Sequence, residues 1–440
     1  MDNGLFINEE LRWLSDVILT RMRLYFNQET PARDILDIQP QPVDGKEGVY
    51  AAFLSDHGFG FEERLCMILS FVPLLKPQLM DYFNVKNTDT GQRFVEFGCE
   101  EKDGILFPTL YTVFFLLCGN DVPRRIALMG RFTQHPIFAN PAFFPETFLK
   151  GRFSSAMQPS HELMDTLIFE RKFEPSFSSD FPARRLVTDR SWSELVLDED
   201  TMRMVNEIRL WVEYGDRIRK EWKLDKMIKP GFRVLFHGPS GTGKTFTASL
   251  LGKETGKDVY CVDLSMVVSK YIGETEKNLS KVFQLAEDKD WILFFDEADA
   301  LFGKRTDLKD AHDRYANQEV AYLLQRVEDY RGLVVLSTNL KSNMDEAFSR
   351  RFQSVIRFPM PNATQRERLW RNTFSPECRF DGETDLKEIA KKHELAGGSI
   401  LNVVQYASVL AMSRKENVIR NADILEGIRR EFQKEGKVMR

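Results

Sequence analysis

The spacing of apolar residues changes near the middle of this 440-residue chain. In the first 170 residues, apolar side chains recur at the i, i+3, i+4 spacing of amphipathic helices over Glu10–Phe26 and Phe61–Leu74. The apolar run Ile105–Cys118 predicts a buried helix, and Arg93–Cys99 with Gly104–Thr109, separated by EEKD, predicts a hairpin. We therefore expect a mainly α-helical N-terminal domain.

Two further segments lie near the C-terminal end of that predicted domain. Residues 132–153 are rich in Phe and Pro, and we expect these side chains to fill the core of a small irregular domain. Residues 171–190 replace periodic apolar positions with Pro, Ser and charge, which predicts a linker. The N-terminal domain is accordingly assigned to residues 1–170 and is expected to recruit partners.

Beyond the linker, short apolar runs alternate with amphipathic stretches, which is typical of a parallel sheet with crossover helices. The predicted strands are Arg233–His237, Asp258–Asp263, Trp291–Phe295, Gly332–Thr338 and Ser354–Phe358. After Pro361 only helical spacing remains, at Gln365–Phe374, Leu386–His393, Ser399–Ser413 and Ala422–Gln433. The fold class is thus α/β, with a five-stranded parallel sheet in residues 191–361 and an all-α domain in residues 362–440.

Composition narrows the class of protein. The 61 basic and 66 acidic residues give a formal charge of −5, which disfavours a nucleic-acid binder. Five scattered cysteines form no C-x-x-C pair and six histidines show no metal-binding spacing, so we expect a reducing, cytoplasmic environment and no zinc. The N-terminus lacks the pattern of a secretion signal, and the longest apolar run is shorter than the roughly 20 residues of a membrane-spanning helix.

The strongest motif follows the first predicted strand of the sheet. Residues Gly238, Pro239, Ser240, Gly241, Thr242, Gly243, Lys244 and Thr245 form a complete G-x-x-x-x-G-K-[ST] sequence before a helix that continues with Phe246. Glycines let successive backbone N–H groups face an anion, and the helix N-terminus adds its positive dipole end. Lys244 is expected to reach the β- and γ-phosphates of a nucleotide, and the Thr245 hydroxyl to bind Mg²⁺.

A pair of carboxylates supports this assignment. Asp296 and Glu297 end the apolar strand Trp291–Phe295, at the edge where open α/β sheets bind ligands. Asp296 suits the Mg²⁺ shell, and Glu297 suits a general base that activates water. An acidic pair at a strand end is common and would carry little weight without the phosphate loop.

With these motifs in place, the chain from about Trp192 onward resembles the AAA+ ATPases that remodel or thread proteins. Leu336-Ser-Thr-Asn339 is similar to their sensor-1 segment, which implies that Asn339 orients the hydrolytic water. Asp345–Phe352 is similar to their arginine-finger segment, so Arg350 and Arg351 are both candidates, Arg351 slightly favoured. The familiar Pro-Gly between the two arginines is absent here.

The resemblance extends to two further segments. Tyr271, Ile272 and Gly273 are similar to the aromatic, hydrophobic and glycine loop that lines the central pore of substrate-threading members. Gly397 and Gly398 are similar to the segment that lets the backbone approach adenine. Packing of Tyr271 in a core turn, and helix capping by the glycines, are the plainer alternatives.

The resemblance implies an ATP- and Mg²⁺-dependent ATPase that assembles into a homohexameric ring and acts on a protein substrate. The whole chain also resembles bacterial AAA proteins of contractile injection systems, some of which carry a winged-helix N-terminal domain. Two rival functions stay open: a nucleic-acid motor or clamp loader, and a nucleotide switch that organises an assembly without repeated hydrolysis.

Overall fold

The chain folds into two compact units, Met1–Pro175 and Ser176–Arg440, each with its own core. The computed structural model describes residues 3–140, 143–145, 153–179, 181–267, 273–287, 289–300, 311–339, 349–434 and 436. Within these residues, no helix is both long enough and apolar enough to cross a membrane.

The first unit is mainly helical, as the apolar spacing predicts. Its α-helices are α1 (Asn3–Tyr25), α2 (Val49–Asp56), α3 (Phe61–Leu75), α4 (Leu110–Cys118), α5 (Val122–Phe132) and α6 (His161–Leu167). 3₁₀ helices lie at Ile35–Asp37, Pro77–Asn84 and Val95–Phe97. The predicted helices over Glu10–Phe26 and Phe61–Leu74 are confirmed by α1 and α3.

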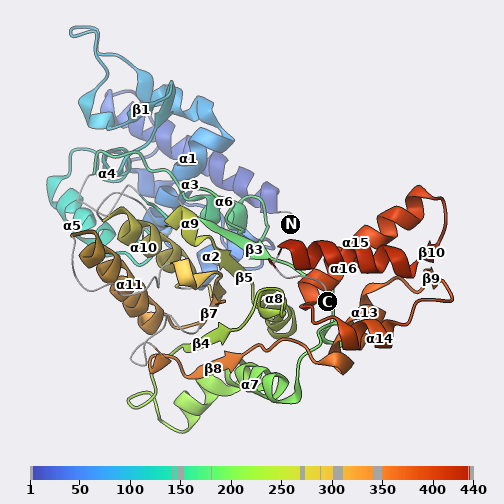
Figure 1. Cartoon of the computed structure of the whole chain (residues 1–440). Helices are drawn as coiled ribbons and strands as arrows, with labels where there is room; N and C mark the ends of the chain where they lie inside the picture. The colour runs from blue at the N-terminus through green and yellow to red at the C-terminus, as the bar shows by residue number, and fades with distance from the viewer. Residues whose placement is uncertain are drawn as a thin grey trace. The chain divides into compact units, whose positions relative to one another are not determined.

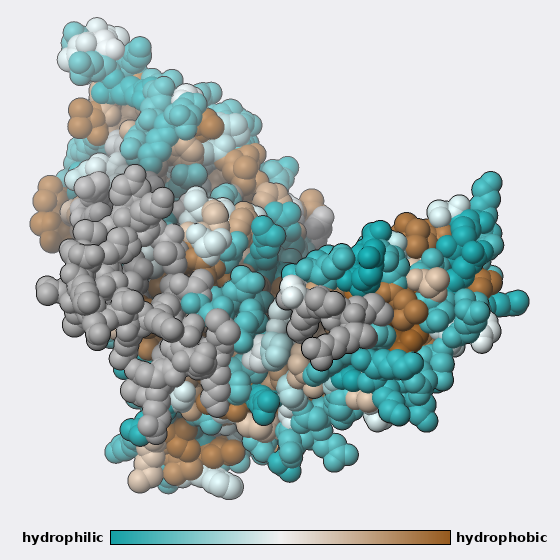
Figure 2. Space-filling model, viewed as in Figure 1, coloured by the Kyte–Doolittle hydropathy of each residue, from teal (hydrophilic) through white to brown (hydrophobic). Residues whose placement is uncertain are grey.

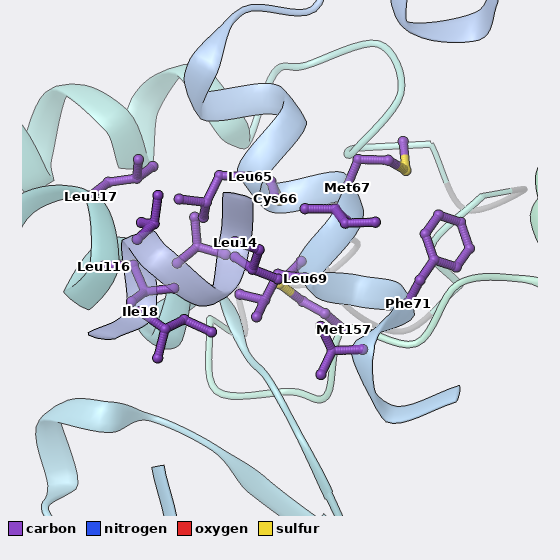
Figure 3. Close-up of a cluster of buried hydrophobic side chains, with 14 of the residues drawn as sticks. Leu14, Ile18, Leu65, Cys66, Met67, Leu69, Phe71, Leu116, Leu117 and Met157 are labelled. Carbon is purple, nitrogen blue, oxygen red and sulfur yellow. The ribbon is translucent and has the colours of Figure 1, made fainter. Parts of the chain in front are cut away.

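The core of this unit forms where α1, α3 and α4 meet. Leu14 and Ile18 of α1 pack with Leu69 of α3 and Leu116 of α4, all fully buried (Figure 3). Phe138, within the Phe- and Pro-rich segment, is also fully buried in this cluster, so the prediction that the segment fills the core is confirmed for its described residues.

A buried ion pair crosses this core. Glu10 of α1 and Arg64 of α3 pair through two guanidinium nitrogens, and their side chains are 1 % and 6 % exposed. Arg64 also donates to the Gln41 backbone oxygen at 2.8 Å. Burial raises the pKa of Glu10, against the opposing effect of the Arg64 charge.

The predicted hairpin exists, but its strands lie elsewhere. β1 (Glu100–Lys102) pairs antiparallel with β2 (Ile105–Phe107), and Val95–Phe97 is a 3₁₀ turn rather than a strand. The assignment of EEKD to the turn was therefore wrong. The turn is Asp103-Gly104, where both residues have positive φ, as a two-residue hairpin turn requires.

The second unit is built on a sheet of six strands among the described residues. Its strands are β3 (Ala183–Leu186), β4 (Phe232–His237), β5 (Val259–Val262), β6 (Ile292–Phe295), β7 (Leu333–Thr338) and β8 (Ser354–Arg357). Their spatial order is β3-β5-β6-β7-β4-β8. The five predicted strands are confirmed as β4 to β8, and they run parallel.

The prediction of a purely parallel sheet was wrong at one edge. β3 lies inside the segment assigned to a linker, yet it pairs antiparallel with β5 from Ala183 opposite Val262 to Leu186 opposite Val259. The sheet is therefore mixed. Composition concealed this strand because an edge strand buries little: Arg184 and Arg185, its central residues, are exposed.

Helices cover both faces of the sheet, which explains its continuous apolar strands (Figure 1). The flanking helices are α7 (Glu199–Glu221), α8 (Lys244–Thr255), α9 (Leu264–Val267), α10 (Glu274–Ala286) and α11 (Ala311–Asp329). Alternate residues of each strand face opposite cores, so Phe236 packs with α7 and α8 while Leu235 packs in the cluster that holds α10 and α11. Because β4 to β8 run parallel, the motif residues at the carboxyl ends of these strands emerge at the same edge of the sheet.

The C-terminal helices form a small group with its own core. They are α13 (Ala363–Thr373), α14 (Leu386–Lys392), α15 (Gly397–Ser413) and α16 (Asn421–Lys434), packed around a buried Trp370. The four predicted helices are confirmed. The all-α description was wrong in one detail, because Arg379–Phe380 (β9) and Val418–Ile419 (β10) pair as two-residue parallel strands.

Candidate nucleotide site

The phosphate-loop motif forms the turn between β4 and α8. Gly243 precedes the helix with a φ of 101°, in the region that only glycine adopts freely. Gly238 has a φ of 149°, and a Cβ built there would lie 2.9 Å from the carbonyl carbon of Phe358 and closer still to its oxygen. The first glycine of the motif is thus required by the close approach of the chain after β8.

Lys244 lies at the start of α8 and is 6 % exposed. Its Nζ donates to the carbonyl oxygens of Gly238 and Pro239 at 2.7 and 2.9 Å, and to Asn339 Oδ1 at 2.9 Å. Burial lowers the pKa of Lys244, and the nearby carboxylates of Asp296 and Asp299 oppose this effect. Three oxygen partners thus hold a buried ammonium group in the loop.

Thr245 and Asp296 meet across the sheet edge. The Thr245 hydroxyl donates to Asp296 Oδ2 at 2.9 Å. A hydroxyl and a carboxylate are hard oxygen donors that fit Mg²⁺, which is held in proteins by few side chains together with phosphate oxygens and water. Among the described residues, no group of three or more His, Cys, Asp or Glu side chains is arranged to hold a metal ion.

Glu297 follows Asp296 in an unusual backbone conformation. Its φ is +50°, which costs a non-glycine residue about 1–2 kcal/mol. Its N–H donates to Asp296 Oδ1 at 3.0 Å, and the residue is exposed at the sheet edge. This conformation is the kind of local strain that clusters at functional sites.

Asn339 is held in place by Asp299, a residue outside the sequence motifs. Asp299 Oδ1 accepts from the Asn339 N–H at 3.3 Å and from the Thr338 hydroxyl at 3.2 Å. Asn339 therefore follows β7 with its backbone N–H bound to Asp299 and its side chain bound to Lys244. No pattern in the sequence marks Asp299, because its role depends on strands β6 and β7 being neighbours.

These residues surround a cavity of about 580 Å³. The predicted residues that line it are Ser240, Gly241, Thr242, Gly243, Lys244, Thr245, Phe246, Asp296, Glu297, Asn339, Gly397 and Gly398. Gly238 and Pro239 lie behind the loop, where their carbonyl groups hold Lys244. The volume is within the range of pockets that bind small molecules.

The C-terminal helices touch the phosphate loop directly. The Gly398 N–H donates to the Gly241 carbonyl at 3.1 Å, and a Cβ on Gly398 would lie 3.2 Å from Gly241 Cα. Gly397 is equally close, since a Cβ there would lie 3.3 Å from the Gly241 oxygen. The two glycines thus bring the N-terminus of α15 against the phosphate loop, and their contact with adenine stays a prediction.

The remaining predicted residues lie outside the cavity or outside the described residues. Arg351 pairs with Glu328 at 2.8 Å, and neither Arg350 nor Arg351 lines the cavity. Tyr271 and Ile272 lie outside the described residues, while Gly273 caps α10 with a φ of 81°.

One wall of the cavity is formed by residues outside the sequence motifs. Arg190, Glu194, Leu195 and Val196 come from the chain before α7, and Leu369 and Leu401 come from α13 and α15. Leu195 packs against the phosphate loop, where a Cβ on Gly243 would lie 3.0 Å from Leu195 Cδ1. Tertiary folding alone brings these residues to the loop, so no local spacing predicts them.

The chain is similar in sequence to one described protein family and to several known proteins. Residues 234–360 match the family described as "ATPase family associated with various cellular activities (AAA)". The chain is 31% identical over 248 residues to a katanin p60 ATPase-containing protein of Strongylocentrotus purpuratus, covering 53% of this chain and 46% of that protein. It is 31% identical over 258 residues to proteasome-activating nucleotidase 2 of Halobacterium salinarum, and the match covers 56% of this chain and 61% of that protein.

A third relative is a katanin p60 ATPase-containing protein of Homo sapiens, which is 29% identical over 259 residues, covering 55% of this chain and 50% of that protein. The chain thus spans about half the length of the curated relatives it matches.

Proposed function

Because residues 234–360 match the AAA ATPase family, we propose that the chain is a Mg²⁺-dependent ATPase that remodels or threads a protein substrate as an oligomeric ring. ATP is the substrate and Mg²⁺ the cofactor. The observation that carries the proposal is the meeting of three sequence-distant motifs at one cavity: Lys244 contacts Asn339, and Thr245 contacts Asp296.

Each residue has a role in this proposal that follows from its chemistry. The loop amides and Lys244 bind the β- and γ-phosphates, and Thr245 with Asp296 holds the metal. Mg²⁺, when bound, neutralises developing phosphate charge. The exposed Glu297 carboxylate accepts a proton from the attacking water, which Asn339 helps to orient.

Self-association is the second part of the proposal. Spreading the charge of the γ-phosphate needs a cation beyond Lys244, and Arg350 or Arg351 of a neighbouring copy is proposed to supply it. Apolar side chains lie exposed just after α7, among them Trp222 and Met227, which are 70 % and 85 % exposed. Figure 2 shows apolar surface near this end of α7, which supports association of copies. A homohexamer is the proposed assembly.

The protein substrate and its path remain proposals as well. The names of the relatives include a proteasome-activating nucleotidase, and Tyr271, Ile272 and Gly273 are proposed to grip an extended chain in a central pore. The first unit is proposed to recruit the substrate, and the whole assembly to act in the cytoplasm on a contractile injection particle. A winged-helix arrangement in the first unit also stays a prediction.

Phosphate release from ATP, measured against protein concentration, tests the function. The rate per chain should rise steeply with concentration if a neighbouring arginine completes the site, and Lys244→Ala should abolish it. A rate per chain that is independent of concentration, together with full activity of Arg350→Ala and Arg351→Ala, would contradict the ring. Turnover that requires DNA would favour the nucleic-acid motor instead.

A further inference from the structure

The connecting segment, residues 183–198, runs from the edge of the sheet to the nucleotide cavity. It begins with β3, which is fixed on β5 by backbone pairing and by Arg185, whose guanidinium contacts Asp258 at 3.0 and 2.7 Å. It ends at Asp198, which caps α7. The first unit ends at Pro175, so this segment follows it closely in the chain. Contacts that fix the segment therefore also fix the point from which the chain leads back to the first unit.

The middle of this segment is anchored on the helix that begins with the phosphate loop. Lys253 of α8 donates from Nζ to the carbonyl oxygens of Asp189 and Arg190, both at 2.9 Å. These two bonds fix the backbone beside α8. The Arg190 guanidinium lies 5.6 Å from the ring centroid of Phe246, which directly follows Thr245.

The described residues neutralise the charge of Arg190 only partly. Its single ion pair among the described residues is with Glu194, at 3.9 Å, and its side chain is 57 % exposed. Glu194 is already engaged, because its other oxygen accepts from the Ser191 N–H at 3.0 Å. Arg190 can therefore offer its N–H groups to a ligand without breaking a close ion pair.

A cation at this position complements the charges around the cavity. Of the described residues that line it, two are basic, Lys244 and Arg190, and four are acidic. Lys244 and the metal serve the β- and γ-phosphates in the proposed function, which leaves the α-phosphate without a cation. A planar guanidinium is well suited to pair with phosphate oxygens.

We propose that Arg190 is a further nucleotide-binding residue, which pairs with the phosphate nearest the ribose and so fastens the connecting segment to the bound nucleotide. The proposal rests on the proposed function, since it presumes that a nucleotide occupies this cavity. It adds a contact from outside the motif residues, on the chain that leads to the first unit. Nucleotide release would then free one attachment of that chain.

Titration of ADP into the full-length protein tests the proposal without relying on turnover. Arg190→Ala should weaken ADP binding about tenfold, the size expected for one charged hydrogen-bonded contact, and Arg190→Lys should restore part of the loss. The loss of ADP affinity in Arg190→Ala should be smaller at about 0.5 M KCl than at about 0.05 M KCl, because salt screens an exposed ion pair. Arg217→Ala is the control, since Arg217 is a similarly exposed arginine of α7 that pairs with Glu221 away from the cavity.

Two results would overturn the proposal. One is an Arg190→Ala protein that binds ADP as tightly as Arg217→Ala does. The other is a loss that is equal at both salt concentrations and accompanied by a lower melting temperature without nucleotide, which would assign Arg190 a purely structural role. If Lys244→Ala also leaves ADP binding intact, the nucleotide site itself is wrong and the proposed function fails with it.

Discussion

Gly238→Ala should damage the nucleotide site by steric collision rather than by loss of a chemical group. The new Cβ would lie 2.9 Å from the Phe358 carbonyl carbon and closer to the oxygen, whereas real Cβ atoms essentially never come within 3.0 Å of such an atom. Both partners are backbone, and the Phe358 N–H is itself bound to the His237 oxygen at 2.8 Å. The loop or the chain after β8 must therefore move.

The expected cost has two parts. The φ of 149° at Gly238 is unfavourable for alanine by roughly 1–3 kcal/mol, and overpacking adds about 1–3 kcal/mol. Gly256→Ala is the matched control: its φ is 68°, but no atom lies within 4 Å of the new Cβ, so only a backbone cost of about 1–2 kcal/mol applies. Gly238→Ala should thus lower the free energy of unfolding by about 1–3 kcal/mol more than Gly256→Ala does, which is the overpacking cost.

Thermal unfolding with and without ADP measures this difference. The transition that ADP raises identifies the second unit, because a ligand stabilises the state that binds it. Its midpoint should fall several degrees further for Gly238→Ala than for Gly256→Ala, since about 1 kcal/mol corresponds to roughly 2–4 °C in a unit of this size. Equal midpoints for the two variants would refute the assignment of Gly238 to the contact with Phe358.

Two further predictions concern buried charge. Arg64→Ala should lower the free energy of unfolding of the first unit by about 3–5 kcal/mol, because the buried Glu10 carboxylate loses its partner; urea unfolding measures this, and adding Glu10→Gln should recover part of the loss. Burial lowers the pKa of His393 below its usual 6.5, so the folded state binds fewer protons. The neutral His393 side chain should therefore make its full contribution to stability above about pH 6.5, and this contribution should be lost as the pH falls through the lowered pKa of His393. His393→Gln should reduce this slope in unfolding measured between about pH 5 and pH 7.5; an unchanged slope would contradict the assignment.

Features set by local chemistry could be predicted from the sequence. The strand, glycine turn and helix of the phosphate loop depend on residues within about twenty positions, and the parallel strands are buried on both faces, so their apolar runs are continuous. The turn Asp103-Gly104 also carries a local signal, the D-G pair, which marks the hairpin turn better than the charged residues before it.

Features that depend on distant neighbours could not be predicted. β3 has the composition of a linker, because Arg184 and Arg185 are exposed on an edge strand. This strand is held in the sheet by its backbone pairing with β5, which the composition does not reveal. Arg190 and Asp299 reach the site only after the sheet has assembled. The resemblance implies that Gly397 and Gly398 let the backbone approach adenine, but nothing in the sequence indicates their contact with Gly241.

The rate of phosphate release from ATP by the Glu297→Gln protein, compared with wild type, tests the central claim most directly. The substitution keeps the size of the side chain while removing its proton-accepting carboxylate, so ATP binding should persist. Hydrolysis should slow by about 10² to 10⁴, the usual contribution of a general base. Wild-type turnover by Glu297→Gln, or no Mg²⁺-dependent phosphate release by the wild-type protein, would contradict the account.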